Sequence, residues 1–248
     1  MEILNNERID LVNDRLSLIQ KTDGLTFGTD ALLLAGFIRG GYKRALELGS
    51  GSGIISMLAL TRGKALSVDA LEVQEEYATL TRRNAELNRL EKSLSVFSVD
   101  LREYTGTAQY DLIFSNPPYM KASCGKMNKE SKKTIARHEI KGDIFDFLEC
   151  AKRNLKYGGD FYCVYRPDRM IDLIFAMRGR GIEPKRLCPI YANTGSAPSI
   201  ILIEGKMGGK PSLKYTNPFI IYKDVENKEY TDDMNFLMEA GTFPPEYK

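Results

Sequence analysis

The alternation of strand-like and helix-like segments between residues 44 and 165 limits the fold of this chain more than any other feature. Compact apolar runs typical of strands occupy residues 44–48, 65–71, 93–99, 110–115 and 159–165. Helical periodicity fills three of the intervals between them, at residues 54–60, 74–90 and 144–155. Such alternation predicts a parallel sheet covered by helices on both faces.

The segments on either side of this core complete the predicted fold. Residues 7–20 alternate around Asn13-Asp14, which predicts a hairpin, and a helix is expected over 31–38. A helix over 168–180 and strands at 189–191 and 198–204 follow the fifth strand. The short link between the last two strands requires them to pair antiparallel. We therefore predict a seven-stranded, mostly parallel α/β sheet with an antiparallel last strand pair.

The apolar runs also predict how deeply individual strands are buried. Residues 93–99 and 110–115 are compact enough to be typical of strands buried on two faces. The tail from Gly208 is polar and has one strand candidate, at 218–224. We expect one main domain at 41–206, with a hairpin and helix packed on it from 1–40 and a C-terminal extension at 207–248.

Composition excludes several classes of protein. The chain is 43% hydrophobic and 27% charged, and no apolar run approaches the roughly 20 residues that span a bilayer. Its four cysteines are well separated, which argues against a zinc site and a disulfide scaffold. The polar, acidic start lacks the features of a secretory signal. We expect a cytoplasmic protein with no membrane segment and no bound metal.

A glycine-rich turn between the first strand and the first helix is a candidate ligand site. The segment runs from Glu47 to Gly53 and reads ELGSGSG. Glycine permits both a sharp turn and a close approach of backbone to a ligand. Glu72 ends the second strand about 20 residues later, where a carboxylate can hold the hydroxyls of a ribose. These features fit both nicotinamide enzymes and methyltransferases.

Three details favour a methyltransferase. The spacing is GxGxG after the acidic Glu47, which would repel a pyrophosphate but suits a ligand with an ammonium group. The third strand ends at Asp100-Leu101, from which an acid can accept the exocyclic amine of an adenine. The antiparallel final strand is the third detail. Upstream, the loop containing Phe27 and Thr29 either closes over the ligand or only begins a helix, with Thr29 or Asp30 as N-cap.

The segment Asn116-Pro117-Pro118-Tyr119 is the most specific motif in the chain. Two prolines fix two φ angles and bias Asn116 toward an extended conformation, at the edge of the sheet where ligands of such folds bind. The Asn116 side-chain oxygen and the Pro117 carbonyl can accept the two hydrogens of a planar amine. Tyr119 can stack on the target ring. This arrangement predicts methyl transfer to an sp2-type nitrogen without a general base.

A basic segment follows this motif. Residues 120–141 have a net charge of +5, against −3 for the remainder of the chain. We expect the segment to contact RNA phosphates. The predicted RNA-binding residues are Lys121, Lys126, Lys129, Lys132, Lys133 and Arg137. His138, the only histidine, is interpreted as a hydrogen-bonded loop residue rather than a catalytic one.

These motifs together resemble the class I S-adenosylmethionine (AdoMet)-dependent amino-methyltransferases, over about residues 22–165. The hairpin, the FGTDALLLAGF run and the C-terminal end resemble, more narrowly, the bacterial tRNA adenine-N6 methyltransferases that act on valine tRNA. The resemblance implies a Rossmann-like methyltransferase domain, a tRNA substrate and no obligate protein partner. The expected AdoMet-binding residues are Phe27, Thr29, Glu47, Gly49, Ser50, Gly51, Gly53, Glu72, Val73, Asp100, Leu101 and Asn116, and the expected catalytic residues are Asn116, Pro117, Pro118 and Tyr119.

Three alternatives remain open. The same Asn-Pro-Pro-Tyr motif serves enzymes that methylate the glutamine of peptide-release factors, but those resemble a fold with a helical domain before the glycine turn, and about 45 residues precede it here. A DNA adenine methyltransferase would need a target-recognition domain. A non-catalytic module that binds AdoMet or RNA would be expected to lose the asparagine or the glycines.

Overall fold

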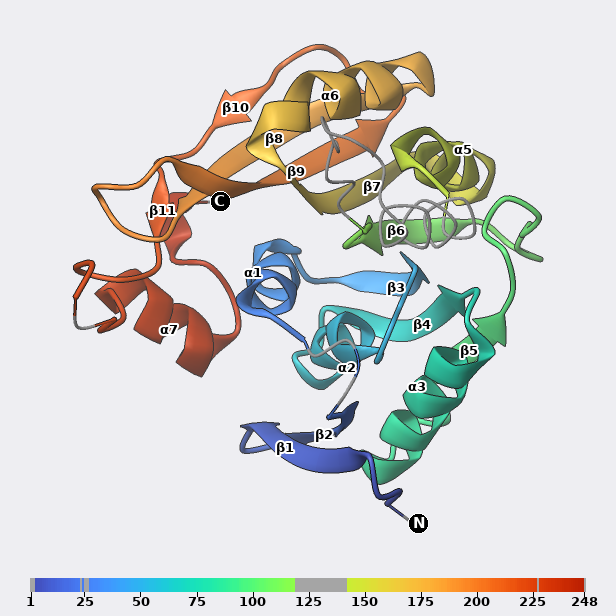
Figure 1. The fold of residues 1–248 in the computed structure, drawn as a ribbon. Helices are drawn as coiled ribbons and strands as arrows, with labels where there is room; N and C mark the ends of the chain where they lie inside the picture. Colours follow the sequence, from blue (N-terminus) through green and yellow to red (C-terminus); the bar gives the residue numbers. More distant parts are fainter. Residues whose placement is uncertain (1–2, 23, 25–26, 119–141, 227, 248) are drawn as a thin grey trace, which may run out of the picture.

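The computed structural model describes residues 3–22, 24, 27–118, 142–226 and 228–247. A twisted, mostly parallel sheet passes through the middle of the molecule, with helices on both faces (Figure 1). Its strand order is β5-β4-β3-β6-β7-β9-β8, followed by two very short strands beside β8. The seven longer strands are β3 (Tyr42–Leu48), β4 (Ala65–Glu72), β5 (Leu94–Ser98), β6 (Tyr110–Ser115), β7 (Leu155–Tyr165), β8 (Ile182–Tyr191) and β9 (Pro198–Met207).

The directions of the strands agree with the predicted mostly parallel sheet and its antiparallel last strand pair. The five strands from β5 to β7 are mutually parallel, whereas β9 runs antiparallel to both β7 and β8. The register aligns Leu48 of β3 with Leu71 of β4 and with Ser115 of β6. The segments that follow these three strands therefore leave the sheet at one common edge, which brings the glycine turn, Glu72 and Asn116 together.

Helices on the two faces of the sheet enclose separate cores. One core contains residues of α1 (Thr29–Phe37), α2 (Ile54–Thr61) and α3 (Glu75–Leu87). The other contains residues of α5 (Ile144–Asn154) and α6 (Met170–Gly179). Helix α5 begins at a capping box, in which the side chains of Asp143 and Asp146 each accept a backbone N–H of the other. Its apolar positions face the sheet.

Two strands differ from the sequence-based expectation. β6 is buried as predicted, but β5 is an edge strand in which only Leu94 is buried and Phe97 is 40% exposed. The prediction of burial on both faces was therefore wrong for β5, because the faces of a strand at the edge of the sheet are covered less completely than those of a central strand. β8 begins at Ile182 rather than 189. The first half of β8 includes the buried Arg186. A charged residue at a buried position interrupts the alternation of apolar and polar residues from which a strand is predicted.

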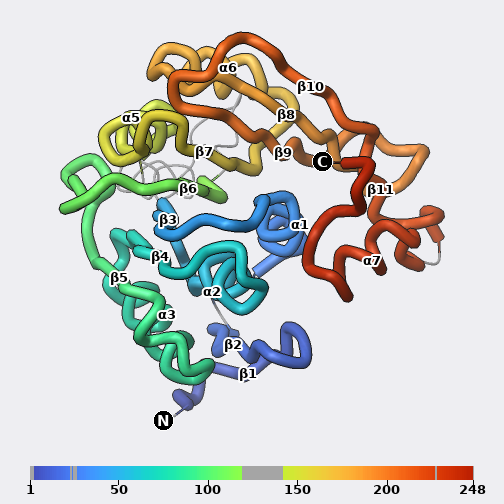
Figure 2. The backbone as a smooth tube through the Cα atoms, turned by 180° about the vertical axis from the view of Figure 1, so that it is seen from behind, coloured from blue at the N-terminus to red at the C-terminus, as the bar shows by residue number. Residues whose placement is uncertain are grey.

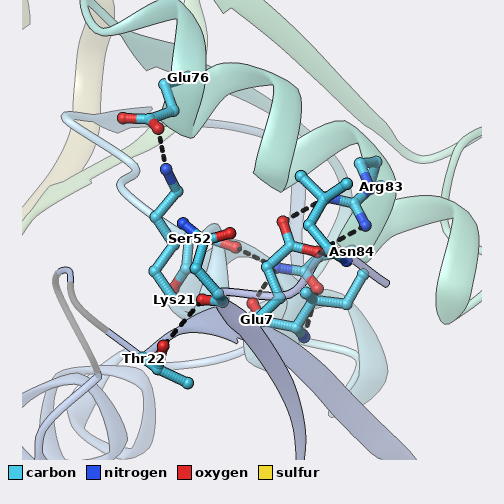
Figure 3. A network of polar contacts seen from close by, with 10 residues as sticks. Glu7, Lys21, Thr22, Ser52, Glu76, Arg83 and Asn84 are labelled. Atoms are coloured by element: carbon cyan, nitrogen blue, oxygen red, sulfur yellow. Dashed lines mark hydrogen bonds and ion pairs between the residues drawn. The ribbon is translucent and has the colours of Figure 1, made fainter. Parts of the chain in front are cut away.

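The predicted N-terminal hairpin is present and packs on helix α3. β1 (Glu7–Asn13) pairs antiparallel with β2 (Leu16–Lys21). The Asn84 side chain of α3 accepts the N–H of Ile19 at 2.7 Å and donates to the Ile19 carbonyl at 3.1 Å, as a neighbouring strand would. Arg83 forms an ion pair with Glu7, at 2.5 Å, and Lys21 pairs with Glu76 (Figure 3). The hairpin is thereby fixed to the face of α3.

The C-terminal tail contributes more structure than its polar composition predicts. Residues Phe219–Ile220 form β11, parallel to β8, as does the two-residue β10 (Lys214–Tyr215). Helix α7 (Asp232–Ala240), which the sequence analysis missed, begins at the N-cap Thr231. It lies beside α1 in both views (Figures 1 and 2). The tail ends in the 3-10 helix η2 (Pro245–Tyr247), and its apolar side chains complete the core around α1.

None of the helices in the described residues is long and apolar enough to cross a membrane. The described ranges likewise contain no cluster of His, Cys, Asp or Glu residues arranged to hold a metal ion. Cys150, Cys163 and Cys188 are buried free thiols that fill space in the interior.

Candidate active site

The glycine turn follows β3 and takes backbone conformations that few other residues adopt. Gly49, Gly51 and Gly53 have φ values of 74°, 56° and 79°. The N–H groups of Gly49 and Ser50 both donate to the Leu71 carbonyl at the end of β4. A Cβ atom at Gly53 would lie 2.5 Å from Thr81 of α3, so only glycine fits there. The turn is therefore held tightly between two strands and a helix.

Glu72 lies directly beside this turn. Its side chain is 6% exposed, and its two carboxylate oxygens have different partners. Oε2 accepts the N–H of Gly51 at 2.9 Å, and Oε1 accepts the N–H of Gln74 at 3.0 Å. These bonds orient the carboxylate at the end of β4. A carboxylate in this place can accept hydrogen bonds from the hydroxyls of a ribose.

Glu47 is the more deeply buried of the two acids. Its carboxylate accepts the backbone N–H of Ser56 at 3.1 Å and the Ser56 hydroxyl, both on α2. The pKa of Glu47 is raised to about 8, mainly by burial, with the Ser56 hydrogen bonds lowering it and the nearby Glu72 carboxylate adding to the rise. At neutral pH this carboxyl therefore holds its proton in most molecules. An approaching cation would favour its charged form.

A cavity of about 400 Å³ lies between the glycine turn and the Asn116-Pro117-Pro118 turn. Most of the residues predicted to bind a cofactor or to act in catalysis line it together. They are Phe27, Glu47, Gly49, Ser50, Gly51, Glu72, Val73, Asp100, Leu101, Asn116, Pro117 and Pro118. The strand ends of β3, β4, β5 and β6 thus all open into one space.

Two residues of the predicted cofactor set, Thr29 and Gly53, are not among those that line the cavity. Thr29 is the first residue of α1, and the N-cap is Gly28. The expectation that Thr29 or Asp30 caps this helix was wrong, because the helix begins two residues before the apolar run that starts at Ala31. Gly53 is the N-cap of α2 and faces Thr81 instead.

Several apolar walls of the cavity, including Ile55, Val99 and Phe147, were not predicted from the sequence. Phe147 lies on α5, and its ring is 3.5 Å from the place where a Cβ of Gly49 would stand. By helical periodicity it is indistinguishable from a core residue, and it is only 2% exposed. Gln74, which bonds Glu72, also lines the cavity. Its position two residues after Glu72 was the only available signal for it.

Asp100 lies at the cavity but already has a partner. Its carboxylate accepts the Nε of Arg102 at 3.0 Å on each oxygen and also the Arg102 backbone N–H. These interactions lower the pKa of Asp100 below its usual value. Asp100 is therefore charged at neutral pH, and an adenine amine would share it with the guanidinium of Arg102.

The Asn116-Pro117-Pro118 turn leaves β6 at a well-anchored point. Ser115, the residue before it, donates its hydroxyl to the Leu48 carbonyl of β3 at 2.7 Å. Pro117 is buried, and both prolines line a second cavity of about 140 Å³ in addition to the first. Tyr119, the RNA-binding candidates Lys121, Lys126, Lys129, Lys132, Lys133 and Arg137, and His138 lie outside the described residues.

Comparison with known proteins identifies the family. Residues 21–174 match the family model described as the methyltransferase small domain. This chain belongs to that family. The match covers the glycine turn, Glu72, Asp100 and the Asn-Pro-Pro-Tyr motif, so the resemblance on which the sequence analysis relied is confirmed at the level of the family.

Curated relatives within the family carry a more specific name. The chain is 30% identical over 165 residues to the tRNA1(Val) (adenine(37)-N6)-methyltransferase of Escherichia fergusonii, which covers 64% of this chain and 63% of the relative. It is 29% identical over 179 residues to the protein of the same name from Tolumonas auensis, covering 71% and 74%. The chain thus matches less than two thirds of the length of the first of these relatives.

Solved structures support the fold of this methyltransferase family member. A predicted O-methyltransferase from Agrobacterium tumefaciens superposes with a TM-score of 0.70 at 21% identity, over 87% of this chain and 98% of that one. The TYW2 protein of M. jannaschii, solved in complex with AdoMet, gives a TM-score of 0.57 at 14% identity, over 84% and 89%. The predicted Rossmann-like class I methyltransferase fold is confirmed.

Proposed function

We propose that this protein transfers a methyl group from AdoMet to the exocyclic N6 of adenine in tRNA, with adenine 37 of a valine tRNA as the target. One observation carries the proposal: the glycine turn and the Asn116-Pro117-Pro118 turn line the same cavity of about 400 Å³. A methyl donor and an acceptor amine can therefore meet inside it. The names of the curated relatives supply the choice of tRNA and of nucleotide.

The residues of the cavity suit the parts of AdoMet. The Glu72 carboxylate can hold the ribose hydroxyls, and Gly49 and Gly51 of the turn leave room for the ligand to approach the backbone. Asp100 can accept the adenine amine, with Val73 and Leu101 against the ring. Glu47 can attract the ammonium of the amino-acid end. When bound, AdoMet supplies a methyl group that is already activated by a positive sulfur.

Asn116 and Pro117 act on the acceptor amine. The lone pair of an aromatic amine is delocalised into its ring, so the nitrogen is a weak nucleophile. If the Asn116 Oδ1 and the Pro117 carbonyl accept its two hydrogens, the nitrogen is drawn toward tetrahedral geometry. The same two oxygens stabilise the positive charge that develops on it. The prolines hold both acceptors in place, which contributes to the rate through positioning.

The remaining parts of the proposal concern RNA and domain organisation. The segment 120–141, with its net charge of +5, contacts the phosphates of the tRNA, and Tyr119 stacks on the target base. Residues 41–206 form the methyltransferase domain, against which 1–40 and 207–248 pack. The target base must be unstacked and rotated out before it can react, and the free energy needed for this is lowest in an unpaired RNA loop. This favours such a loop as the substrate.

The test is to incubate the pure protein with labelled AdoMet and, separately, total tRNA, ribosomal RNA or release factor from a strain that lacks the gene. We expect label in tRNA, recovered as N6-methyladenosine. Asn116→Ala should lower kcat/KM by roughly 100-fold or more, since a preorganised polar partner of the transition state is lost. AdoMet affinity should fall far less than kcat/KM, because Glu72 and Asp100 still hold the cofactor.

Asn235→Ala is the matched control, because Asn235 is exposed on α7 and lines neither cavity. It should behave as the wild type. Label in release factor rather than tRNA would move the substrate to a protein glutamine. Binding of AdoMet without label in any acceptor would indicate a non-catalytic module.

A further inference from the structure

The Pro117-Pro118 turn separates the large cavity from a second one, of about 140 Å³, for which the proposed mechanism has no occupant. The walls of this second cavity come from the end of β7, from the 3-10 helix η1 (Pro167–Arg169) and from the start of α5. They are Pro117, Pro118, Gly142, Asp143, Ile144, Phe145, Tyr165, Arg166 and Arg169. Because the two cavities share the prolines, a ligand in the second one would lie next to the turn that holds the acceptor amine.

The chemistry of this second cavity combines apolar surface with two guanidinium groups. Tyr165 is nearly buried, at 9% exposure, and Phe145 is partly buried. The side chains of Arg166 and Arg169 are 31% and 38% exposed. Among the described residues of the lining, Asp143 alone has a carboxylate, and it accepts the N–H groups of Phe145 and Asp146 as the N-cap of α5. The described part of the wall therefore holds two guanidinium groups and one carboxylate.

Both arginines are held in place by acids that do not line the cavity. Arg166 donates from Nε and Nη2 to Asp168, at 2.8 and 2.7 Å. Arg169 pairs with Asp172 through Nε. Each acid contacts one edge of a guanidinium, which carries five N–H donors in total. Surface ion pairs of this kind contribute little stability by themselves. They do restrict the movement of the guanidinium, so that less conformational entropy is lost when a ligand binds.

We propose that this second cavity holds the sugar and phosphate next to the target adenine, with Arg166 and Arg169 binding the phosphate, while the adenine itself enters the large cavity at Asn116. A planar guanidinium fits a phosphate with two parallel hydrogen bonds, and the aromatic side chains suit the sugar. This inference rests on the proposed function, because it assigns the nucleotide-binding part of the same site. It gives the two arginines the role of positioning residues.

The experiment compares Arg166→Gln and Arg169→Gln with the wild type by measuring tRNA affinity over a series of salt concentrations. Each change should weaken tRNA binding by about five- to fiftyfold and reduce the slope of log Kd against log salt by about one. AdoMet affinity, measured by calorimetry, should stay within twofold. Arg178→Gln is the matched control: Arg178 is also paired on α6, with Glu183, but lines neither cavity.

Arg166→Lys and Arg169→Lys keep the charge next to Asp168 and Asp172 and serve if the glutamine variants fail to fold. A lysine cannot make the two parallel bonds, so the tRNA affinity should still fall. Unchanged affinity and salt slope in both arginine positions, with a wild type that methylates tRNA, would overturn the inference and leave the proposed function standing. A wild type that neither binds nor methylates tRNA would remove both.

Discussion

Glu47 and Glu72 flank the glycine turn, yet their environments differ in one respect that can be measured. Glu72 accepts two backbone N–H groups at the open end of β4. Glu47 is fully enclosed, and its pKa is raised from 4.5 to about 8, mainly by burial. A carboxyl group that is easier to protonate in the folded state stabilises that state at low pH. This contribution is lost progressively as the pH rises from the unfolded to the folded pKa.

The first prediction concerns the pH dependence of Glu47→Gln. Glutamine does not titrate, so the variant should gain stability relative to the wild type between about pH 5 and pH 8, by up to about 1.4 kcal/mol per pH unit. Above pH 8 the difference should level off. Urea denaturation at several pH values measures it. A difference that is constant from pH 5 to pH 9 would show that Glu47 is charged throughout.

The sequence identified the residues of the site that carry a chemical signature and missed those that do not. Glu72, Asn116 and Pro117 were found because their type and place after a strand are unusual. Phe147 was not found, since a buried aromatic on a helix is most often a core residue. Arg166 and Arg169 were overlooked for another reason: their place beside the prolines depends on how β7 lies next to β6, which the sequence alone does not determine.

At the scale of elements, the hairpin was predictable but its attachment was not. Alternation of residue types reveals β1 and β2, whereas the partner of β2 is a row of asparagines on α3. Asn84 bonds both backbone groups of Ile19 and also donates to the Ser52 carbonyl of the glycine turn, at 3.1 Å. Asn88, one helical turn later, bonds both backbone groups of Ser17 but does not reach the turn.

The second prediction compares these two asparagines. Asn84→Ala should lower the free energy of unfolding by about 2–4 kcal/mol, because buried backbone groups lose their partners. It should also weaken AdoMet binding severalfold, since the glycine turn loses one of its bonds to α3 and keeps only that from the Thr81 hydroxyl to the Gly51 carbonyl among those the structure describes. Asn88→Ala should lower stability by a smaller amount and leave AdoMet affinity unchanged. Equal effects of both variants on affinity would contradict the link between the hairpin and the turn.

At the scale of the whole molecule, the C-terminal tail is joined to the core by a buried arginine. Arg186 of β8 is 2% exposed and donates to the carbonyls of Tyr247 and Phe37, each at 2.8 Å. Its guanidinium lies 3.8 Å from the centre of the Phe37 ring and forms an ion pair with Glu204. This arrangement could not be predicted from the sequence. A charged residue such as Arg186 is normally expected at the surface, and the segments around Phe219 and α7 are polar.

The third prediction is that Arg186→Leu destabilises the protein by about 3–5 kcal/mol, since Glu204 would remain buried without its main partner. Replacing Glu204 with leucine as well should restore part of the loss. Arg39→Leu is the control, because Arg39 is half exposed at 3.4 Å from Glu204 and should cost less than about 1 kcal/mol. Urea denaturation of the three variants gives the comparison. A double variant as unstable as the single one would argue against the ion pair.

A crystal structure of the protein with S-adenosylhomocysteine would show whether a methyl donor lies between the glycine turn and the Asn116-Pro117-Pro118 turn. We expect the ribose hydroxyls of the ligand on the Glu72 carboxylate and its sulfur directed toward Asn116. Density for the ligand outside this cavity, or a sulfur that points away from Asn116, would be inconsistent with methyl transfer at this site.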